Sequence, residues 1–574
     1  MPKLKIVLAC PEVRRIDRPD VTWLLTGCHE TDAARLEQSG NERNELEAEI
    51  CARAGDATII KVIHDGGRLN RVGAWRGPTA MHEVFRLEKS NGDLFVSDHF
   101  RSLLARLPIG ERTPSDDAII DHFLFRTTPG HNAYCRSVKR LGHGERIMIE
   151  LASGESTNSL FQKLDENSEP RSISEYLDDV DQALDDVLSP FKQREDITNL
   201  FSGGIDSTVI QTYLDPKTAA LNLATDAKGA AATMEANYAR TAASLLGATV
   251  QRQEVCQSEF LRDLELATED IAMPIQVGRL AVFARAFSND YDNYITGQNA
   301  DSLFGLSVLF RKIASLFANP LVLRCLTLSA RAIARKDLAR RNIWRERLEL
   351  LLPSAQELSA DPDSMLGFGA RSETFSEFDL AEMIFGEEAI SRRLEKRFDY
   401  VTEHVALLGP SGNKFLRHLE IGSWIDSLCS DYALQLRHLA MANKKSVLFP
   451  YLSGPVVRSA LRIPVKDRYI QGFEGKYVLK RLLKRRLPGY PTGQRKGTTA
   501  LVNFPQYYRT GPLSKIWDSY EMPDFIPSEA RNRIRSMPLN ISYSAANYAI
   551  WKRRVLENTR LEPLAFEQSY EWAF

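Results

Sequence analysis

The chain has 574 residues, 43% of them hydrophobic and 26% charged, which is an ordinary composition for a folded globular protein. Its length predicts more than one domain. The formal net charge of -1 gives no overall field that would select nucleic acid or an anionic membrane. No stretch of the sequence is long and apolar enough to span a bilayer, so we expect neither nucleic acid nor a membrane as a partner.

The opening residues do not follow the pattern of a secretory signal. Their apolar run is short, and Glu12, Arg14 and Arg15 soon follow it. The seven cysteines are odd in number, widely scattered and contain no Cys-x-x-Cys pair. This distribution argues against a disulfide framework, a structural zinc site or a redox pair, and we expect a cytoplasmic protein.

The first part of the chain, to about residue 150, is predicted to be rich in β-strands. Residues 80–87 and 94–97 are apolar-patterned runs on either side of Asn91-Gly92, a pair typical of a hairpin turn. Residues 143–150 predict another strand. The polar segment 152–171, rich in Ser, Asn, Glu and Asp, predicts a domain boundary.

After this boundary the pattern changes to alternating strands and helices. Ser172 and Glu175 form a capping box ahead of apolar residues with helical spacing. Short apolar strands are then predicted at 197–201, 219–224, 249–255 and 294–295, with a helix at 235–246. This order predicts a parallel sheet whose ligands bind at the carboxyl ends of its strands. From about residue 306 the chain is predicted to be mainly helical.

One motif between a predicted strand and helix carries the chemistry, Ser202-Gly203-Gly204-Ile205-Asp206-Ser207. Two glycines allow a close backbone approach to a phosphate, and the following helix offers free N–H groups and a positive dipole end. Asp206 would repel phosphate, so it predicts a magnesium ligand. A plain Gly-Gly turn followed by a helix cap is the alternative, and the completeness of the motif argues against it. The predicted nucleotide-binding residues are Leu200, Ser202, Gly203, Gly204, Asp206, Ser207 and Gly297.

The motif resembles the loop of the ATP pyrophosphatase superfamily, whose members cleave ATP to AMP and pyrophosphate. A second segment, Thr296-Gly297-Gln298-Asn299-Ala300-Asp301-Ser302-Leu303-Phe304-Gly305, is similar to the Ser-Gly-Glu-Gly-x-Asp-Glu-x-Phe-Gly run of asparagine synthetases. The resemblance implies ATP and Mg²⁺ as cofactors, with Asp301 as the second metal ligand beside Asp206. Two carboxylates on one magnesium ion would shield the polyphosphate and stabilise the departing pyrophosphate. Alone, Asp301 would be interpreted as a helix cap.

Further segments resemble the same family, and together the resemblance spans roughly residues 180 to 560. They are residues 235–240, Phe449-Pro450-Tyr451-Leu452, Gly475-Lys476-Tyr477 with the helix up to Leu487-Pro488, and Gln494-Arg495-Lys496-Gly497. By resemblance Lys476 is a catalytic residue that holds the phosphates, and Lys496 helps to hold pyrophosphate. The implied fold is α/β: residues 1–165 form a degenerate, β-rich amidotransferase-like (Ntn-type) domain. Residues 172–574 form an ATP pyrophosphatase-type parallel α/β domain with helical additions.

The sequence departs from asparagine synthetases at three positions. Those enzymes hydrolyse glutamine with an N-terminal cysteine, whereas position 2 here is Pro2, and Cys10 cannot provide a terminal amine beside its sulfur. Gln298 replaces a glutamate, so general-base chemistry cannot depend on it. Ser453 follows the Pro-Tyr-Leu stretch where the family has an aspartate. These departures argue against ammonia as the amine acceptor.

Two related groups keep the synthetase loop and lack the glutaminase, the β-lactam synthetases and the macrolactam synthetases (cyclases) of lasso peptides. In both, the substrate carries its own amine, which gains a high effective concentration. We favour the lasso-peptide group, because the pattern of β-lactam synthetases has a Tyr at the position of Gln298. It implies a precursor peptide as substrate, with a leader-peptide-binding protein and a leader protease as partners. The basic segment 311–350 could bind that peptide, but a pair of amphipathic helices with solvated arginines is the more frequent explanation of such a segment.

Other functions remain open. An ammonia-dependent asparagine synthetase and a β-lactam-type small-molecule synthetase are enzymatic alternatives. RNA thiolation or GMP-type synthesis is disfavoured, since thiolation enzymes of this type usually need cysteine pairs. A degenerate nucleotide-binding regulator is the non-enzymatic alternative, and the intact Asp206, Asp301 and Lys476 argue against it.

Overall fold

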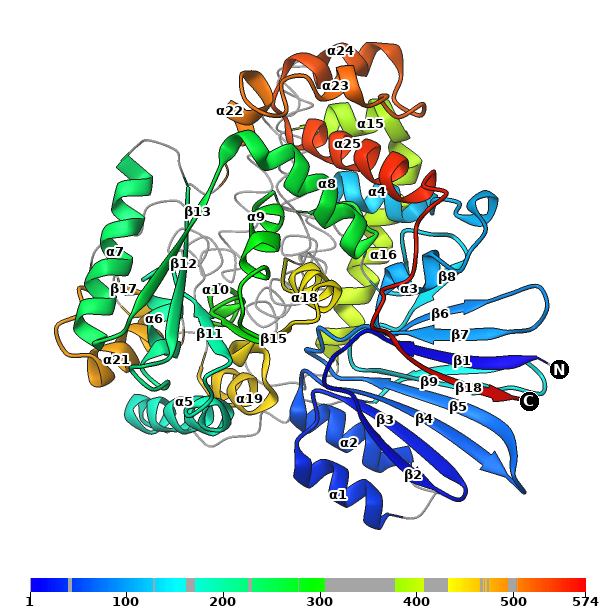
Figure 1. Ribbon diagram of the computed structural model, residues 1–574, viewed down its shortest axis with the longest axis horizontal. Helices are drawn as coiled ribbons and strands as arrows, with labels where there is room; N and C mark the ends of the chain where they lie inside the picture. The colour runs from blue at the N-terminus through cyan, green and yellow to red at the C-terminus, as the bar shows by residue number, and fades with distance from the viewer. Residues whose placement is uncertain are drawn as a thin grey trace, which may run out of the picture.

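The computed structural model describes residues 2–39, 44–126, 128, 130–161, 171–225, 230–276, 278–304, 377–406, 432–464, 468, 470–471, 474–493, 502 and 504–574. Two β-sheets occupy the N-terminal part, and a parallel sheet with surrounding helices follows (Figure 1). None of the helices in these ranges is long and apolar enough to cross a membrane.

The two N-terminal sheets face each other across an apolar core. The first has the order β18-β1-β7-β6-β8 and the second β10-β9-β5-β4-β3-β2. Their strands are β1 (Lys3–Leu8), β2 (Arg14–Arg18), β3 (Val21–Thr26), β4 (Thr58–Asp65), β5 (Arg68–Arg76), β6 (Phe85–Glu88), β7 (Leu94–Ser97), β8 (Val138–Arg140), β9 (Glu145–Glu150), β10 (Ser156–Leu160) and β18 (Gln568–Ala573).

At β3 the second sheet is covered on both faces, which explains why this strand is buried along its whole length. Leu24, Ile60 and Val72 pack toward the first sheet, whereas Trp23 and Ile59 pack in a separate apolar cluster. That second cluster includes residues of α1 (Glu30–Gln38) and α2 (Asn44–Ala54), which lie against the outer face in Figure 1. A sheet buried on both faces favours continuous apolar strands over alternating ones.

The predicted hairpin is confirmed, but its first strand is shorter than predicted. β6 pairs antiparallel with β7, but β6 begins at Phe85 instead of residue 80. The preceding backbone is bonded elsewhere: the amide of Met81 donates to Asp56, and the carbonyl of Ala80 accepts from Arg76. Those groups are therefore not available to a sheet ladder.

The two ends of the chain lie side by side. β18 pairs antiparallel with β1, with Lys3 opposite Ala573 and Leu8 opposite Gln568. The two termini accordingly meet at the same edge in Figure 1. The last strand of the chain therefore completes the first sheet, a pairing that the sequence did not indicate.

The predicted parallel sheet is confirmed. It has the order β13-β12-β11-β14-β15, and each neighbouring pair is parallel. Its strands are β11 (Ile197–Leu200), β12 (Ala219–Thr225), β13 (Val250–Val255), β14 (Asn293–Thr296) and β15 (Ser446–Leu448). The first four match the predicted strands to within one or two residues at each end. β15 was missed, because its three residues carry no periodic signal.

Helices flank this sheet. The capping box of Ser172 and Glu175 is confirmed at the start of α5 (Ile173–Leu188), and α7 (Ala230–Leu246) begins five residues before its predicted start. The other helices used below are α6 (Ile205–Gln211), α8 (Phe260–Ile271), α9 (Arg279–Ala286), α10 (Ala300–Phe304), α16 (Glu387–Ala406), α18 (Tyr432–Ala442), α19 (Gly454–Arg462) and α21 (Tyr477–Arg486).

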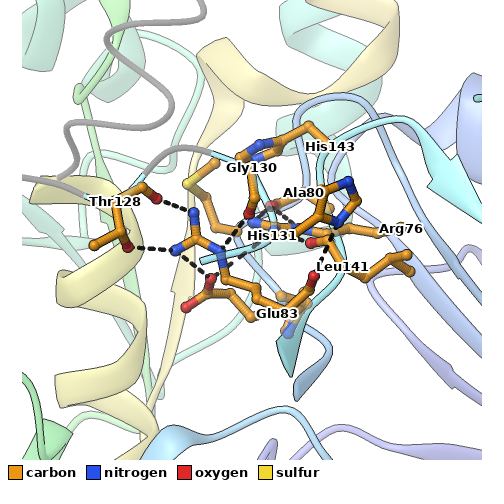
Figure 2. A network of polar contacts seen from close by, with 12 residues as sticks. Arg76, Ala80, Glu83, Thr128, Gly130, His131, Leu141 and His143 are labelled. Carbon is orange, nitrogen blue, oxygen red and sulfur yellow. Dashed lines mark hydrogen bonds and ion pairs between the residues drawn. The ribbon is translucent and has the colours of Figure 1, made fainter. Parts of the chain in front are cut away.

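A buried charged network joins the N-terminal sheets to α18. Glu83 is fully buried and lies 3.3 Å from Arg140, 3.8 Å from Arg76 and 2.7 Å from His438 of α18. Figure 2 shows how Arg76 also reaches the carbonyls of Ala80 and Leu141 and the ring of His143. Buried ionic groups are stable only when paired and hydrogen-bonded, so this network fixes the contact between the two parts of the chain.

Candidate functional site

The Ser-Gly-Gly motif forms the turn between β11 and α6, as predicted. Gly203 has φ of +70°, and a Cβ there would lie 2.3 Å from the backbone nitrogen of Ala239 in α7. Only glycine meets both conditions without strain. The hydroxyls of Ser202 and Ser207 lie 3.3 Å apart, and Ser202 accepts from the amide of Gly204. The turn is thus closely packed, and no side chain caps the first N–H groups of α6.

The second motif lies directly beside the first. β14 ends at Thr296, and a Cβ on Gly297 would lie 3.0 Å from the backbone nitrogen of Ser207 and 3.1 Å from Cβ of Asp206. Two neighbouring parallel strands thus bring their carboxyl ends together at this point. Asn299 then takes a left-handed conformation, with φ of +67°, before α10 begins.

Lys476 joins the two motifs through its side chain. Its Nζ donates to both carboxylate oxygens of Asp206 at 2.8 Å and lies 2.5 Å from Oδ1 of Asp301. Burial lowers the pKa of Lys476, but the carboxylates of Asp206 and Asp301 outweigh burial and raise it above its usual value. The ammonium therefore stays charged and acts as an electrostatic partner rather than a base.

The backbone of Lys476 is also unusual. It is the N-cap of α21 and has left-handed dihedrals, φ of 53° and ψ of 40°. A non-glycine residue in this region costs about 1 kcal/mol or more, and such residues are concentrated at functional sites. This backbone conformation places the ammonium of Lys476 beside the two aspartates.

A cleft opens at the carboxyl ends of β11, β12 and β14. Its volume is about 930 Å³, counting space open to solvent. Among the predicted residues, the cleft is lined by Leu200, Ser202, Asp206, Ser207, Gly297 and Asp301. Gly203 and Gly204 do not line it, and Gly203 shapes the turn from behind by its contact with α7.

The carboxylate pair fits a magnesium ion. Asp206 and Asp301 approach one ammonium closely enough to share it, so they can share one small cation. In the described ranges no group of three or more His, Cys, Asp or Glu residues could hold a metal. Mg²⁺ typically binds through one or two carboxylates together with substrate phosphates, so two ligands agree with a metal that arrives with ATP. It would supply charge shielding of the phosphates.

Three further residues support the site, and sequence reasoning missed them. The buried hydroxyl of Tyr451 donates to the backbone oxygen of Asp206 at 3.1 Å, and that of Tyr490 donates to the oxygen of Gly203 at 2.6 Å. Asn222 in β12 donates to the oxygen of Phe201 at 2.8 Å. Asn222 left a signal as a polar residue inside an apolar strand, and Tyr451 lies in the stretch 449–452 that resembles the family, although no role was predicted for it.

Of the positions that depart from the family pattern, Gln298 lies at this site, and Ser453 follows the short helix that carries Tyr451. Gln298 lines the cleft, and its backbone N–H donates to the hydroxyl of Thr296. Ser453 follows the short helix Pro450–Leu452, where its hydroxyl donates to the carbonyl of Pro450. Neither contributes an ionised group to the cleft.

The cysteines of the N-terminal sheets are poor nucleophiles. Burial raises the pKa of Cys10 and of Cys28 to about 12, and burial also raises the pKa of Cys51 and of Cys135. A thiol attacks as the thiolate, which is scarce at neutral pH for such groups. These four residues therefore do not provide a reactive thiolate in residues 2–161.

Two predictions fall on residues outside the described ranges. Lys496 is one of them, and the basic segment 311–350 is the other. Both remain predictions.

The family comparison agrees with this geometry. The model of the family described as asparagine synthase matches residues 179–518, which include Asp206, Asp301 and Lys476. A search of curated proteins found no match. Because the family model covers more than half of the chain, this protein belongs to the asparagine synthase family.

Proposed function

We propose that this protein is a macrolactam synthetase of the lasso-peptide type. On this proposal it adenylates an Asp or Glu side chain of a precursor peptide and joins that side chain to the peptide's α-amine. ATP-dependent amide-bond synthesis is the chemistry of the family to which the chain belongs. The convergence of Asp206, Asp301 and Lys476 beside the phosphate-type loop is the observation that carries the adenylation step.

The proposed reaction has two steps. First, a carboxylate oxygen of the peptide attacks the α-phosphorus of ATP, and the bond from that phosphorus to the oxygen bridging to the β-phosphate breaks. Pyrophosphate leaves, and Lys476 neutralises charge that develops on the phosphates. Second, the amine nitrogen attacks the acyl carbon and loses a proton, and the bond to AMP breaks. One amide is formed, and the peptide loses one water.

The proposal that the amine belongs to the substrate rests on what the chain lacks at its described positions. Gln298 carries no carboxylate that could accept a proton, and Pro2 carries no thiol for glutamine hydrolysis. Burial raises the pKa of Cys10 to about 12, so this thiol is not a substitute. An amine already held beside the adenylate would need no ammonia source.

Two enzymatic alternatives use the same site. A β-lactam-type synthetase would close a ring within a small molecule, and an ammonia-dependent asparagine synthetase would take aspartate. A degenerate regulator would bind nucleotide without turnover. The lasso-peptide proposal also implies a leader-peptide-binding protein and a leader protease as partners, and a cytoplasmic location.

The test measures AMP and pyrophosphate released from ATP and magnesium in parallel reactions. One contains aspartate and ammonia, and the other a candidate precursor core peptide. AMP release only with the peptide, together with a mass loss of one water, would support the macrolactam synthetase. AMP release with aspartate would replace this proposal by the asparagine-type reaction. No AMP release with either substrate would favour a regulator that binds nucleotide without turnover.

A further inference from the structure

A second cation, Arg279, lies in the cleft that holds the nucleotide loop. It is the first residue of α9 and lines the same cleft as Asp206 and Gly297. Its guanidinium carbon lies 4.2 Å from the ring centroid of Tyr432, at the start of α18. Tyr432 in turn packs edge-on against Phe283, with the ring centroids 5.6 Å apart. The guanidinium is thus oriented by an aromatic pair.

Arg279 has no acidic partner in the described part of the protein. Its Nε is buried and makes no hydrogen bond. Arg285, also in α9, shows the contrast, because its guanidinium lies 2.7 Å from Asp263 and also pairs with Glu259. Lys476 is likewise neutralised by two aspartates. Arg279 is the only Lys or Arg among the described residues that line the cleft.

A guanidinium in this situation favours an anionic ligand. A buried N–H group without an acceptor costs free energy until a ligand supplies one. The planar fork of arginine matches a carboxylate with two parallel hydrogen bonds, and stacking on an aromatic ring pre-organises it. The phosphates of ATP already have the loop at Ser202 and the ammonium of Lys476. Among the described residues no acidic group accounts for Arg279, so its guanidinium is available for a second anion.

We propose that Arg279 binds the carboxylate of the acyl substrate and presents it beside the nucleotide loop. This inference rests on the proposed carboxylate-activating function. It makes Arg279 a substrate-binding residue that selects a charged side chain over its neutral amide. The apolar rings of Phe283 and Tyr432 would pack against the methylene groups that carry the carboxylate.

The test uses binding rather than turnover, with two matched probes. N-acetyl-aspartate α-methylamide carries one side-chain carboxylate, and N-acetyl-asparagine α-methylamide carries the amide in its place. Binding of each to the full-length protein is measured by calorimetry with magnesium and the non-cleavable nucleotide α,β-methylene-ATP. The variants are Arg279→Gln and Arg279→Lys. Arg262→Gln, an exposed arginine on α8, is the control.

We expect the wild type to bind the acid and not the amide. Arg279→Gln should weaken binding of the acid by about tenfold or more, as for loss of a charge-assisted hydrogen bond, and should leave nucleotide affinity unchanged. Arg279→Lys should retain part of the affinity, and Arg262→Gln all of it. A melting curve for each variant shows whether the fold is retained.

Three outcomes would overturn the inference: equal binding of acid and amide, no binding of the acid by the wild type, or loss of nucleotide affinity in Arg279→Gln. The last would assign Arg279 to ATP instead. Because the probes require no turnover, a protein that binds the acid through Arg279 but forms no macrolactam would refute only the proposed function.

Discussion

Lys476 donates to both carboxylate oxygens of Asp206 at 2.8 Å, although 270 positions separate the two residues. The same ammonium lies 2.5 Å from Asp301. One cation thereby holds together the two carboxylates that would bind magnesium when ATP enters. Before any ligand binds, these three groups carry a net charge of -1, because two carboxylates face one ammonium, and a magnesium ion would offset that charge.

Replacement of Lys476 is expected to remove most of the activity. Lys476→Ala should lower substrate-dependent AMP release by about 10² to 10³-fold, as for loss of one preorganised charge in a transition state. Lys476→Arg keeps the charge but changes its shape, so it should retain only part of the rate. Lys480→Ala, one turn later on α21, is the matched control. Unchanged AMP release in Lys476→Ala would contradict this role.

The raised pKa of Lys476 also predicts a pH profile. Its pKa lies above the ordinary value of 10.5, so the ammonium should remain protonated throughout the neutral and mildly alkaline range. Deprotonation of Lys476 should therefore not lower the rate of AMP release between pH 7 and 9. The pH profiles of the wild type and of Lys476→Arg should have the same shape in this range. A wild-type fall that Lys476→Arg removes would show that Lys476 titrates there.

The two aspartates should differ in their effect on magnesium dependence. Asp206 has a side chain that is 13% exposed, whereas that of Asp301 is 69% exposed. Charges in a less solvated place interact more strongly, so Asp206→Asn should raise the magnesium concentration needed for AMP release more than Asp301→Asn does. Asp290→Asn, at an exposed position before β14, should have no effect. Equal magnesium dependence in all three variants would contradict the assignment.

Much of the nucleotide-binding part was predictable from local sequence. β11, β12 and β14 were predicted because each contains a short apolar stretch, whereas β13 is mostly polar and fits the alternation of strands and helices. The Ser172–Glu175 capping box marked α5. The Ser-Gly-Gly turn was found because glycine at Gly203 is a backbone requirement. In each case the signal lies within a few consecutive residues.

The remainder depends on contacts between distant segments. Tyr451 supports Asp206 across 245 positions and Tyr490 supports Gly203 across 287, and a buried tyrosine looks the same in sequence whichever backbone oxygen it reaches. The pairing of β18 with β1 is equally remote. Arg279 was overlooked because nothing beside it in the sequence shows that its charge lacks a partner.

Gly203 provides a test of the turn itself. Gly203→Ala would place a Cβ 2.3 Å from the backbone nitrogen of Ala239 and force φ of +70° on an L side chain. Because the opposing atoms are backbone, they cannot rotate away, and we expect a loss of stability of more than about 1 kcal/mol with loss of nucleotide binding. Chemical denaturation and nucleotide titration would measure both. Gly110→Ala, where a Cβ meets nothing within 4 Å, should be neutral.

The buried network in Figure 2 predicts how stability depends on pH. Burial raises the pKa of Glu83, but Arg140, His438 and Arg76 outweigh burial and lower it to about 2, against an ordinary value of 4.5. A carboxyl group whose pKa is lower in the folded state stabilises the fold when it is ionised. Its contribution is therefore complete above about pH 4.5 and is lost as the pH falls toward 2.

Glu83→Gln should remove this contribution, because a neutral amide leaves the buried guanidinium groups without their counter-charge. At pH 7 we expect a loss of about 3 to 5 kcal/mol in the free energy of unfolding, as for breaking a buried ion pair. The difference from the wild type should shrink as the pH is lowered from 4.5, which a series of denaturant titrations would measure. Glu88→Gln, exposed at the end of the nearby strand β6, serves as the control. A difference that stays constant down to pH 3 would mean that Glu83 acts through packing alone, because a neutralised carboxyl group would then stabilise the fold as well as the ionised one.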